Sequence, residues 1–264
     1  MEIDPYAPPR ATLEDIPPPT TTRGEWIPFE DETRYPSFGQ RILETFRWIF
    51  REQERAAAGF RDGDALGAPI GFICLLGYLP AVIPGLLGAL WPRQPLWMAW
   101  MHLPAPRPAE GFLLLIPIVS IVVFAPVGLI LGGLIGGLLN HAGLWLVRGT
   151  KQGHGLVATL RSTLYTAAVL SWVMLPLNLA KSIPGIPGQV FELLALLVSV
   201  LLPASYQGYL LARTHRVETW RGVLGAWLPG LAALVCLGTC AGLAYWFAGD
   251  AVREMFKQAR PGMF

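Results

Sequence analysis

The stretch from Gly111 to Val147, GFLLLIPIVSIVVFAPVGLILGGLIGGLLNHAGLWLV, decides the class of this chain because it contains no Asp, Glu, Lys or Arg. A helix needs about 20 apolar residues to cross a hydrocarbon core about 30 Å thick. At about 1.5 Å per residue this stretch would extend about 55 Å, too long for one straight span and too short for two spans plus a turn. We therefore predict one long membrane helix, bent near Pro126 or projecting into the cytoplasm.

Four more apolar runs of membrane-spanning length accompany this stretch, and short loops rich in proline, glycine or arginine separate them. The composition agrees, since 14% of the residues are charged, against about 25% in an ordinary globular chain. We predict an all-α polytopic membrane protein with a bundle of five transmembrane helices. The four additional spans cover about residues 66–90, 160–179, 190–211 and 223–247.

The chain before the first span divides into two parts. Eight prolines in residues 1–37 predict a disordered Pro-rich cytoplasmic tail, because proline removes a backbone donor and breaks helices. Residues 38–65 form an amphipathic interfacial helix and linker, whose apolar face either enters the headgroup region beside its arginines or docks on the protein itself. The five-span membrane domain covers residues 66–247, and a short tail covers 248–264. The apolar face consists of Phe38, Ile42, Phe46, Ile49 and Phe50.

The orientation is predicted from the positive charges of the short loops, since Lys and Arg are retained on the cytoplasmic side. The count favours a cytoplasmic N-terminus and a C-terminus outside. The first residues lack a basic stretch followed by an apolar one, so we expect no cleaved secretory signal. Abundant Arg, Ala, Gly and Pro indicate a bacterial source, and hence the inner membrane. The residues that weigh most are Arg47, Arg51, Arg55, Arg61, Arg148, Lys151, Arg161, Arg213, Arg216 and Arg221.

Glycines recur every four residues in the second span, a pattern that lets two helix backbones approach closely. We predict helix packing here, against another helix of the bundle or against a second copy of the chain. The glycines concerned are Gly128, Gly132, Gly133, Gly136 and Gly137.

A polar pair, Asn140 and His141, follows these glycines inside the apolar stretch. Polar groups at this depth are costly unless they find partners, and the third span offers Thr163, Tyr165 and Thr166. The pair is either satisfied structurally by hydrogen bonds or handles a ligand, a proton or a lipid headgroup. Zinc is a weaker interpretation, because the histidines show no ligand spacing. We expect no cofactor, no catalytic residues and no nucleic-acid partner, since no motif for any of them occurs.

Residues from about Glu44 to Tyr245 resemble the Yip family of Ypt/Rab-interacting membrane proteins, in particular its bacterial branch. The resemblance implies a five-span bundle with a cytoplasmic N-terminus and no established catalytic residues. Eukaryotic members act in vesicle traffic by contacting small GTPases through their cytosolic N-terminal region. The landmarks, in order, are Asp64, Leu66, Gly67, Pro69, His141, the segment 155–161 with Tyr165, Pro187-Gly188, Gly208, His215, Ala226 and Pro229.

Together these patterns predict a non-enzymatic membrane scaffold or adaptor that organises the membrane or recruits partners at its cytoplasmic face. The alternative is a small transporter, channel or lipid-translocating protein. The expected partners are membrane lipids, including anionic ones, an unidentified membrane or cytoplasmic protein, and a second copy of the chain. The residues expected to contact a partner or lipid, or to form a polar network, are Asn140, His141, Arg148, Lys151, Arg161, Tyr165 and His215.

Overall fold

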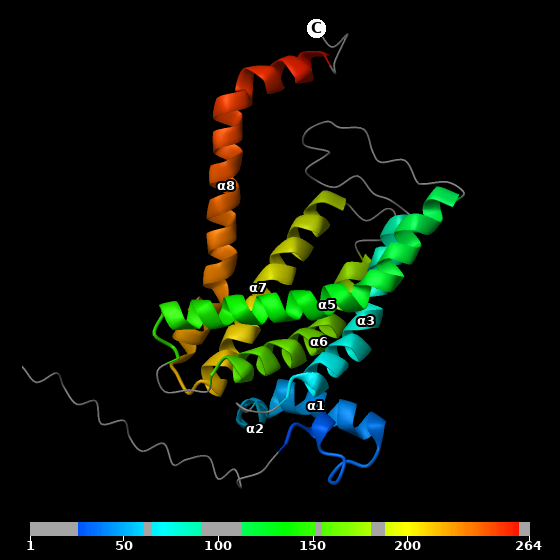
Figure 1. Ribbon diagram of the computed structural model, residues 1–264, viewed down its shortest axis with the longest axis vertical. Helices are drawn as coiled ribbons and strands as arrows, with labels where there is room; N and C mark the ends of the chain where they lie inside the picture. The colour runs from blue at the N-terminus through cyan, green and yellow to red at the C-terminus, as the bar shows by residue number, and fades with distance from the viewer. Residues whose placement is uncertain (1–25, 61–64, 91–111, 151–154, 181–187, 259–264) are drawn as a thin grey trace, which may run out of the picture. The chain divides into compact units, whose positions relative to one another are not determined.

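The structure is a computed structural model that describes residues 26–60, 65–90, 112–150, 155–180 and 188–258. Helices and turns account for this part of the chain, and none of its residues lies in a strand (Figure 1). The chain forms two compact units, residues 1–59 and 60–264, here called the N-terminal unit and the membrane unit. The helices are η1 Pro28–Glu30, α1 Phe38–Arg51, α2 Gln53–Gly59, α3 Gly67–Leu90, α5 Phe112–Leu146, α6 Leu156–Ala180, α7 Gly188–Thr214 and α8 Thr219–Gln258.

Five helices of the membrane unit are long and apolar enough to cross a bilayer: α3, α5, α6, α7 and α8. The protein is thus an all-α polytopic membrane protein, as the apolar runs predicted. Helix α5 is one continuous helix of 35 residues that contains Pro117 and Pro126, and Figure 1 shows it changing direction along its course. Helix α8 continues to Gln258, so the helix runs past residue 247, where the last span was predicted to end.

The membrane helices pack most closely where α5 and α7 end and where α6 and α8 begin. A Cβ atom on Gly143 would collide with the backbone carbonyl of Gly225, and one on Gly208 would collide with the backbone of Gly222 and Val223. These two contacts bring α8 against both α5 and α7 at backbone distance. Leu144, Leu211 and Ala226 are buried together beside them. Small residues have this role in membranes, where lipid is as apolar as the side chains and close packing supplies the attraction.

Away from this region the helices expose their apolar side chains. Every residue of α8 from 230 to 240 is exposed, including Leu234, Val235 and Leu237. Such exposure would be unfavourable in water, but in a bilayer these side chains contact hydrocarbon, so their exposure has no hydrophobic free-energy cost. Helix α8 is therefore tightly packed at its beginning and lipid-accessible beyond it, whereas α3, α5 and α6 stay packed against one another further along their length.

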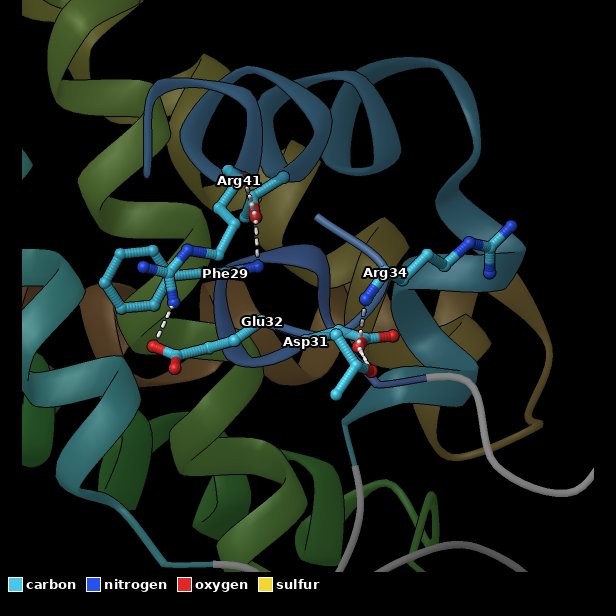
Figure 2. Close-up of polar contacts among 7 residues, drawn as sticks. Phe29, Asp31, Glu32, Arg34 and Arg41 are labelled. Atoms are coloured by element: carbon cyan, nitrogen blue, oxygen red, sulfur yellow. Dashed lines mark hydrogen bonds and ion pairs between the residues drawn. The ribbon is translucent and has the colours of Figure 1, made fainter. Parts of the chain in front are cut away.

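The N-terminal unit is folded over part of the segment predicted to be disordered. Residues 26–37 contain η1 and a turn, and Ile27 is buried against Gly59, where an added Cβ would lie 2.7 Å from the Ile27 Cδ1 atom. The Phe29 N–H donates to the Thr45 hydroxyl at 2.9 Å, which ties η1 to α1 (Figure 2). The disordered tail was thus predicted too long at its C-terminal end, because local proline content says nothing about Ile27 and Tyr35 becoming buried. Residues 1–25 lie outside the described residues.

The glycine contact at the packed end gives a testable prediction. We expect Gly143→Val to lower the thermal stability of the detergent-purified protein strongly, because the new side chain would have to displace the α8 backbone, and overpacking costs about 1–3 kcal/mol or more. Gly136→Val is the matched control in the same helix, since nothing lies within 4 Å of a Cβ there. For both variants, the fraction of protein that stays folded after heating is measured by size-exclusion chromatography. Equal losses in the two would contradict the packing described above.

Candidate functional site

The first half of α6 is a buried row of polar side chains inside an otherwise apolar bundle. Arg161 is 1% exposed, and Ser162 and Tyr165 are fully buried. Burying so many polar groups in a membrane protein is costly unless they are hydrogen-bonded. The row therefore needs partners on the neighbouring helices. Its polar members are Thr159, Arg161, Ser162, Thr163, Tyr165 and Thr166.

A single hydroxyl connects two histidines from different helices. Thr159 Oγ1 of α6 lies 2.9 Å from His141 Nδ1 of α5 and 2.8 Å from Nε2 of His215, which follows α7. The hydroxyl has one hydrogen, so it can donate to only one of the two ring nitrogens, and at least one of these nitrogens must carry a proton and donate to the hydroxyl. The tautomers of the two rings are therefore coupled through Thr159. His215 is fully buried, His141 is half-buried, and the ring centroids are 6.0 Å apart.

Arg161 and Tyr165 join α6 to the beginning of α3. The Arg161 guanidinium donates to the Ala65 carbonyl at 2.8 Å. The Tyr165 ring lies between Phe60 and Phe72, with centroid distances of 6.0 and 4.9 Å. Both residues therefore belong to the interior of the membrane unit, and neither lies on the cytoplasmic surface expected for Arg161.

Two further polar contacts hold α6 to other helices. The Gln207 amide of α7 donates to the Thr163 hydroxyl at 3.2 Å, within a buried pair. The Trp172 indole donates to the Leu76 carbonyl of α3 at 2.8 Å. With the histidine bridge, α6 is hydrogen-bonded to residues of α3, α5 and α7 and to His215. The polar row thus fixes the register of the bundle.

The structure corrects the predicted partners of the polar pair in α5. His141 bonds to Thr159, one helical turn before the predicted Thr163, while Thr163 is engaged by Gln207. Asn140 is half-buried beside His141. The sequence missed Thr159 and Gln207, because one threonine and one glutamine carry no spacing signal and only the helix packing brings them to their partners. It also found no metal-ligand spacing for the histidines, although the fold brings two of them together.

The two basic residues predicted in the loop after α5 are Arg148 and Lys151. Arg148 is exposed and adopts a positive φ of 59° in the turn after α5, while Lys151 lies outside the described residues.

Two of the five glycines predicted to pack helices do so. Gly133 and Gly137 face α6, where an added Cβ would lie 2.5 Å from Leu164 Cδ2 and 2.7 Å from Leu160 Cδ2, respectively. The other three, Gly128, Gly132 and Gly136, have no atom within 4 Å of an added Cβ.

Three arginines of α1 and α2 bind carboxylates of their own unit. Arg41 pairs with Glu32 (Figure 2), Arg47 with Glu52 at 3.1 Å, and Arg55 with Glu52. Residues 26–59 hold six acidic side chains and five arginines, so the described part of the unit has no excess of positive charge. This weakens the expectation that α1 is held to anionic lipid by its arginines, since such attraction depends on a local excess of positive charge.

An acidic turn stabilises the segment after η1. The Thr33 hydroxyl donates to Asp31 Oδ1 at 2.7 Å, and the Arg34 N–H donates to the same oxygen at 3.0 Å (Figure 2). The Thr33 hydrogen bond, helped by Arg34, lowers the pKa of Asp31 below its ordinary value. Asp31 therefore stays ionised at neutral pH, and its contribution to stability is lost only when the pH falls through this lowered pKa.

Apolar side chains remain exposed on one face of α1. Leu43, Phe46 and Phe50 share this face at i, i+3 and i+7. Leu43 is 71% exposed, Phe50 is 36% exposed, and Phe46 is half-buried. Phe46 and Phe50 form a ring pair with centroids 6.5 Å apart. By contrast, Trp48 and Ile49 are buried. Part of the predicted apolar face is thus covered by protein, and we call Leu43, Phe46 and Phe50 the α1 apolar face.

No family model, curated protein or solved structure matches this chain. Within the described residues no three His, Cys, Asp or Glu side chains gather in a way that could hold a metal ion. The chemistry of the chain is therefore read from its own contacts: a hydrogen-bonded polar row inside the bundle and an exposed apolar face on the N-terminal unit.

The threonine bridge can be tested by removing its hydroxyl. We expect Thr159→Val to destabilise the purified protein by about 1–3 kcal/mol, because both histidines would keep their burial and lose a hydrogen-bond partner. Thr239→Val is the control, since Thr239 is exposed on α8 and bonds only to the Val235 carbonyl of its own helix among the contacts seen. Thermal unfolding in detergent compares the two. A control as unstable as Thr159→Val would refute the structural role of the bridge.

Proposed function

We propose that this protein is a non-enzymatic integral membrane scaffold or adaptor of the Yip-like type, which recruits a protein partner through its N-terminal unit. The observation that carries the proposal is the α1 apolar face. Eleven charged side chains between residues 26 and 59 are too many for the hydrocarbon core, so this unit lies outside it. A folded unit in water that exposes Leu43 and Phe50 on one helical face, with half-buried Phe46 between them, has a surface suited to a partner.

The spacing of this face favours a protein over a lipid surface. Apolar residues at i, i+3 and i+7 are the anchors by which an amphipathic helix docks in a partner's groove. Binding to anionic lipid would instead use free arginines beside the apolar face, whereas Arg47 is paired with Glu52 and Glu44. The charge pairing therefore leaves apolar contact as the main source of affinity.

The adaptor hypothesis is also favoured over a small transporter, channel or lipid-translocating protein. Of the polar pair that motivated the transport hypothesis, His141 is hydrogen-bonded to Thr159 of α6, and Asn140 is half-buried beside it. The hydrogen bond to Thr159 accounts for His141 as a residue that holds α5 to α6. The α1 apolar face has no such internal explanation, since Leu43 stays 71% exposed.

A site-specific photo-crosslinker tests the adaptor proposal. With the crosslinker at Leu43, we expect a discrete crosslinked protein band in native membranes, and we expect Phe50→Glu to abolish it by placing a charge in the docking face. The same crosslinker at Arg34, which is exposed outside this face, is the matched control. If position 43 gives no band, or only the bands seen from position 34, the adaptor proposal is wrong.

We also propose that the protein lies in a bacterial inner membrane with its N-terminus in the cytoplasm and its C-terminus outside. Exposed arginines support this orientation, because Arg148 ends the α5 turn while Arg213 and Arg216 lie at the α7–α8 turn, and positive charge is retained on the cytoplasmic side. A reporter that is active only outside the cytoplasm, fused after Phe264, should be active. Activity of a cytoplasmic reporter alone at this position would reverse the orientation.

A further inference from the structure

A hollow of about 530 Å³ runs along one side of α7. Its lining residues follow one helical stripe, at i, i+3, i+4, i+7, i+8 and i+11, and they are mostly apolar. It is open over most of its surface, so it faces what surrounds the protein in the membrane. We call it the α7 groove, and its lining residues are Val198, Leu201, Leu202, Ser205, Tyr206 and Tyr209.

One end of the α7 groove carries two hydrogen-bond donors. Arg213, one turn after Tyr209, donates through Nη2 to the Tyr209 hydroxyl oxygen at 3.2 Å, and its guanidinium lies 5.2 Å from the Tyr209 ring centroid. Because the Tyr209 oxygen accepts this bond, its own O–H proton can be donated elsewhere. The Arg213 side chain is exposed, and a guanidinium is a planar fork of N–H donors that matches phosphate oxygens. Both donors can therefore reach a single anionic group.

The length of the α7 groove fits one leaflet of a bilayer. From Val198 to Tyr209 the helix rises about 16 Å at 1.5 Å per residue, close to half of a hydrocarbon core about 30 Å thick. An apolar chain lying along Val198, Leu201 and Leu202 would thus reach towards the bilayer centre. Its polar end would then meet Tyr209 and Arg213 at the headgroup level, where tyrosine and arginine are favoured.

Contacts with α8 fix the middle of the groove. The Trp227 indole of α8 donates to the Ser205 hydroxyl at 3.3 Å, so Ser205 of the lining is satisfied by protein and needs no polar group from the occupant. Next to it, the close approach of Gly208 and Gly222 holds α7 against α8. The middle of the groove is therefore preformed and apolar, and an occupant needs a polar group only at the end with Arg213.

We propose that the α7 groove binds an anionic glycerophospholipid, with an acyl chain along Val198–Tyr206 and the phosphate held by Arg213 and Tyr209. The positive charge at one end and the apolar stripe along the rest complement such a lipid at both ends. An anionic lipid is preferred over a zwitterionic one because it brings no ammonium group to compete with Arg213 for the phosphate. The inference does not depend on the adaptor proposal, since it uses only residues of the membrane unit.

Native mass spectrometry of the full chain, released from detergent with added phosphatidylglycerol or phosphatidylcholine, tests the site. We expect the protein to retain phosphatidylglycerol at least about fivefold more tightly than phosphatidylcholine, the size expected for one well-placed arginine near a lipid headgroup. Arg213→Gln should remove this preference, and Tyr209→Phe should weaken phosphatidylglycerol retention by roughly threefold. Arg216→Gln is the charge-matched control, because Arg216 is exposed in the same turn but lies outside the groove lining, and it should retain the lipid normally.

Three results would overturn the proposal. The first is equal retention of the two lipids by the unaltered chain, which would mean that the groove meets bulk lipid only. The second is an equal loss in Arg213→Gln and Arg216→Gln, which would mean that general surface charge attracts the lipid. The third is a lipid-free dimer that Leu202→Trp disrupts, which would make the groove an interface between two copies. Arg213 is exposed, so its variant is expected to fold, and unchanged thermal stability checks this.

Discussion

The membrane unit depends on two places where helix backbones touch. At Gly143–Gly225 and Gly208–Gly222 the absence of side chains lets α8 lie directly against α5 and α7. In a membrane the interior of the bundle gains little from hydrophobic burial, because lipid is equally apolar, so close packing and hydrogen bonds carry the association. Once these contacts are made, Leu144, Leu211 and Ala226 are buried and the ends of α5 and α7 lie beside the start of α6.

The polar row of α6 follows from this arrangement. Thr159 can bridge His141 and His215 only because α5 and the end of α7 approach α6 from different sides. A buried polar network of this kind adds less to net stability than to specificity, since alternative registers would leave its members without partners. The apolar surfaces of these helices alone would allow many packing arrangements, and the polar network selects one of them. This explains why a bundle of membrane spans contains an arginine, several threonines and two histidines.

The two units expose apolar side chains for different reasons. On α5, α7 and α8 such exposure is the normal consequence of facing lipid, and the α7 groove adds a polar end at Arg213 to it. On α1 the exposed face lies among charges that pair with one another, as Arg41 does with Glu32 and Arg47 with Glu52. Those pairs hold the N-terminal unit together and reduce its attraction to anionic surfaces. Lipid recognition is thus inferred at α7 and protein recognition at α1.

The sequence by itself determined the five spans, the continuous long helix α5 and the amphipathic character of α1, because these depend on local hydropathy, length and period. It also singled out Asn140 and His141 as residues that need partners, and His141 has one in Thr159. Only the tertiary structure decided that Thr159 is the partner of His141, that Arg161 points into the bundle, and that residues 26–37 fold onto α1. Each of these depends on groups far apart in the chain, and a helix of uniformly apolar residues has no periodic signal that reveals which side meets protein and which meets lipid.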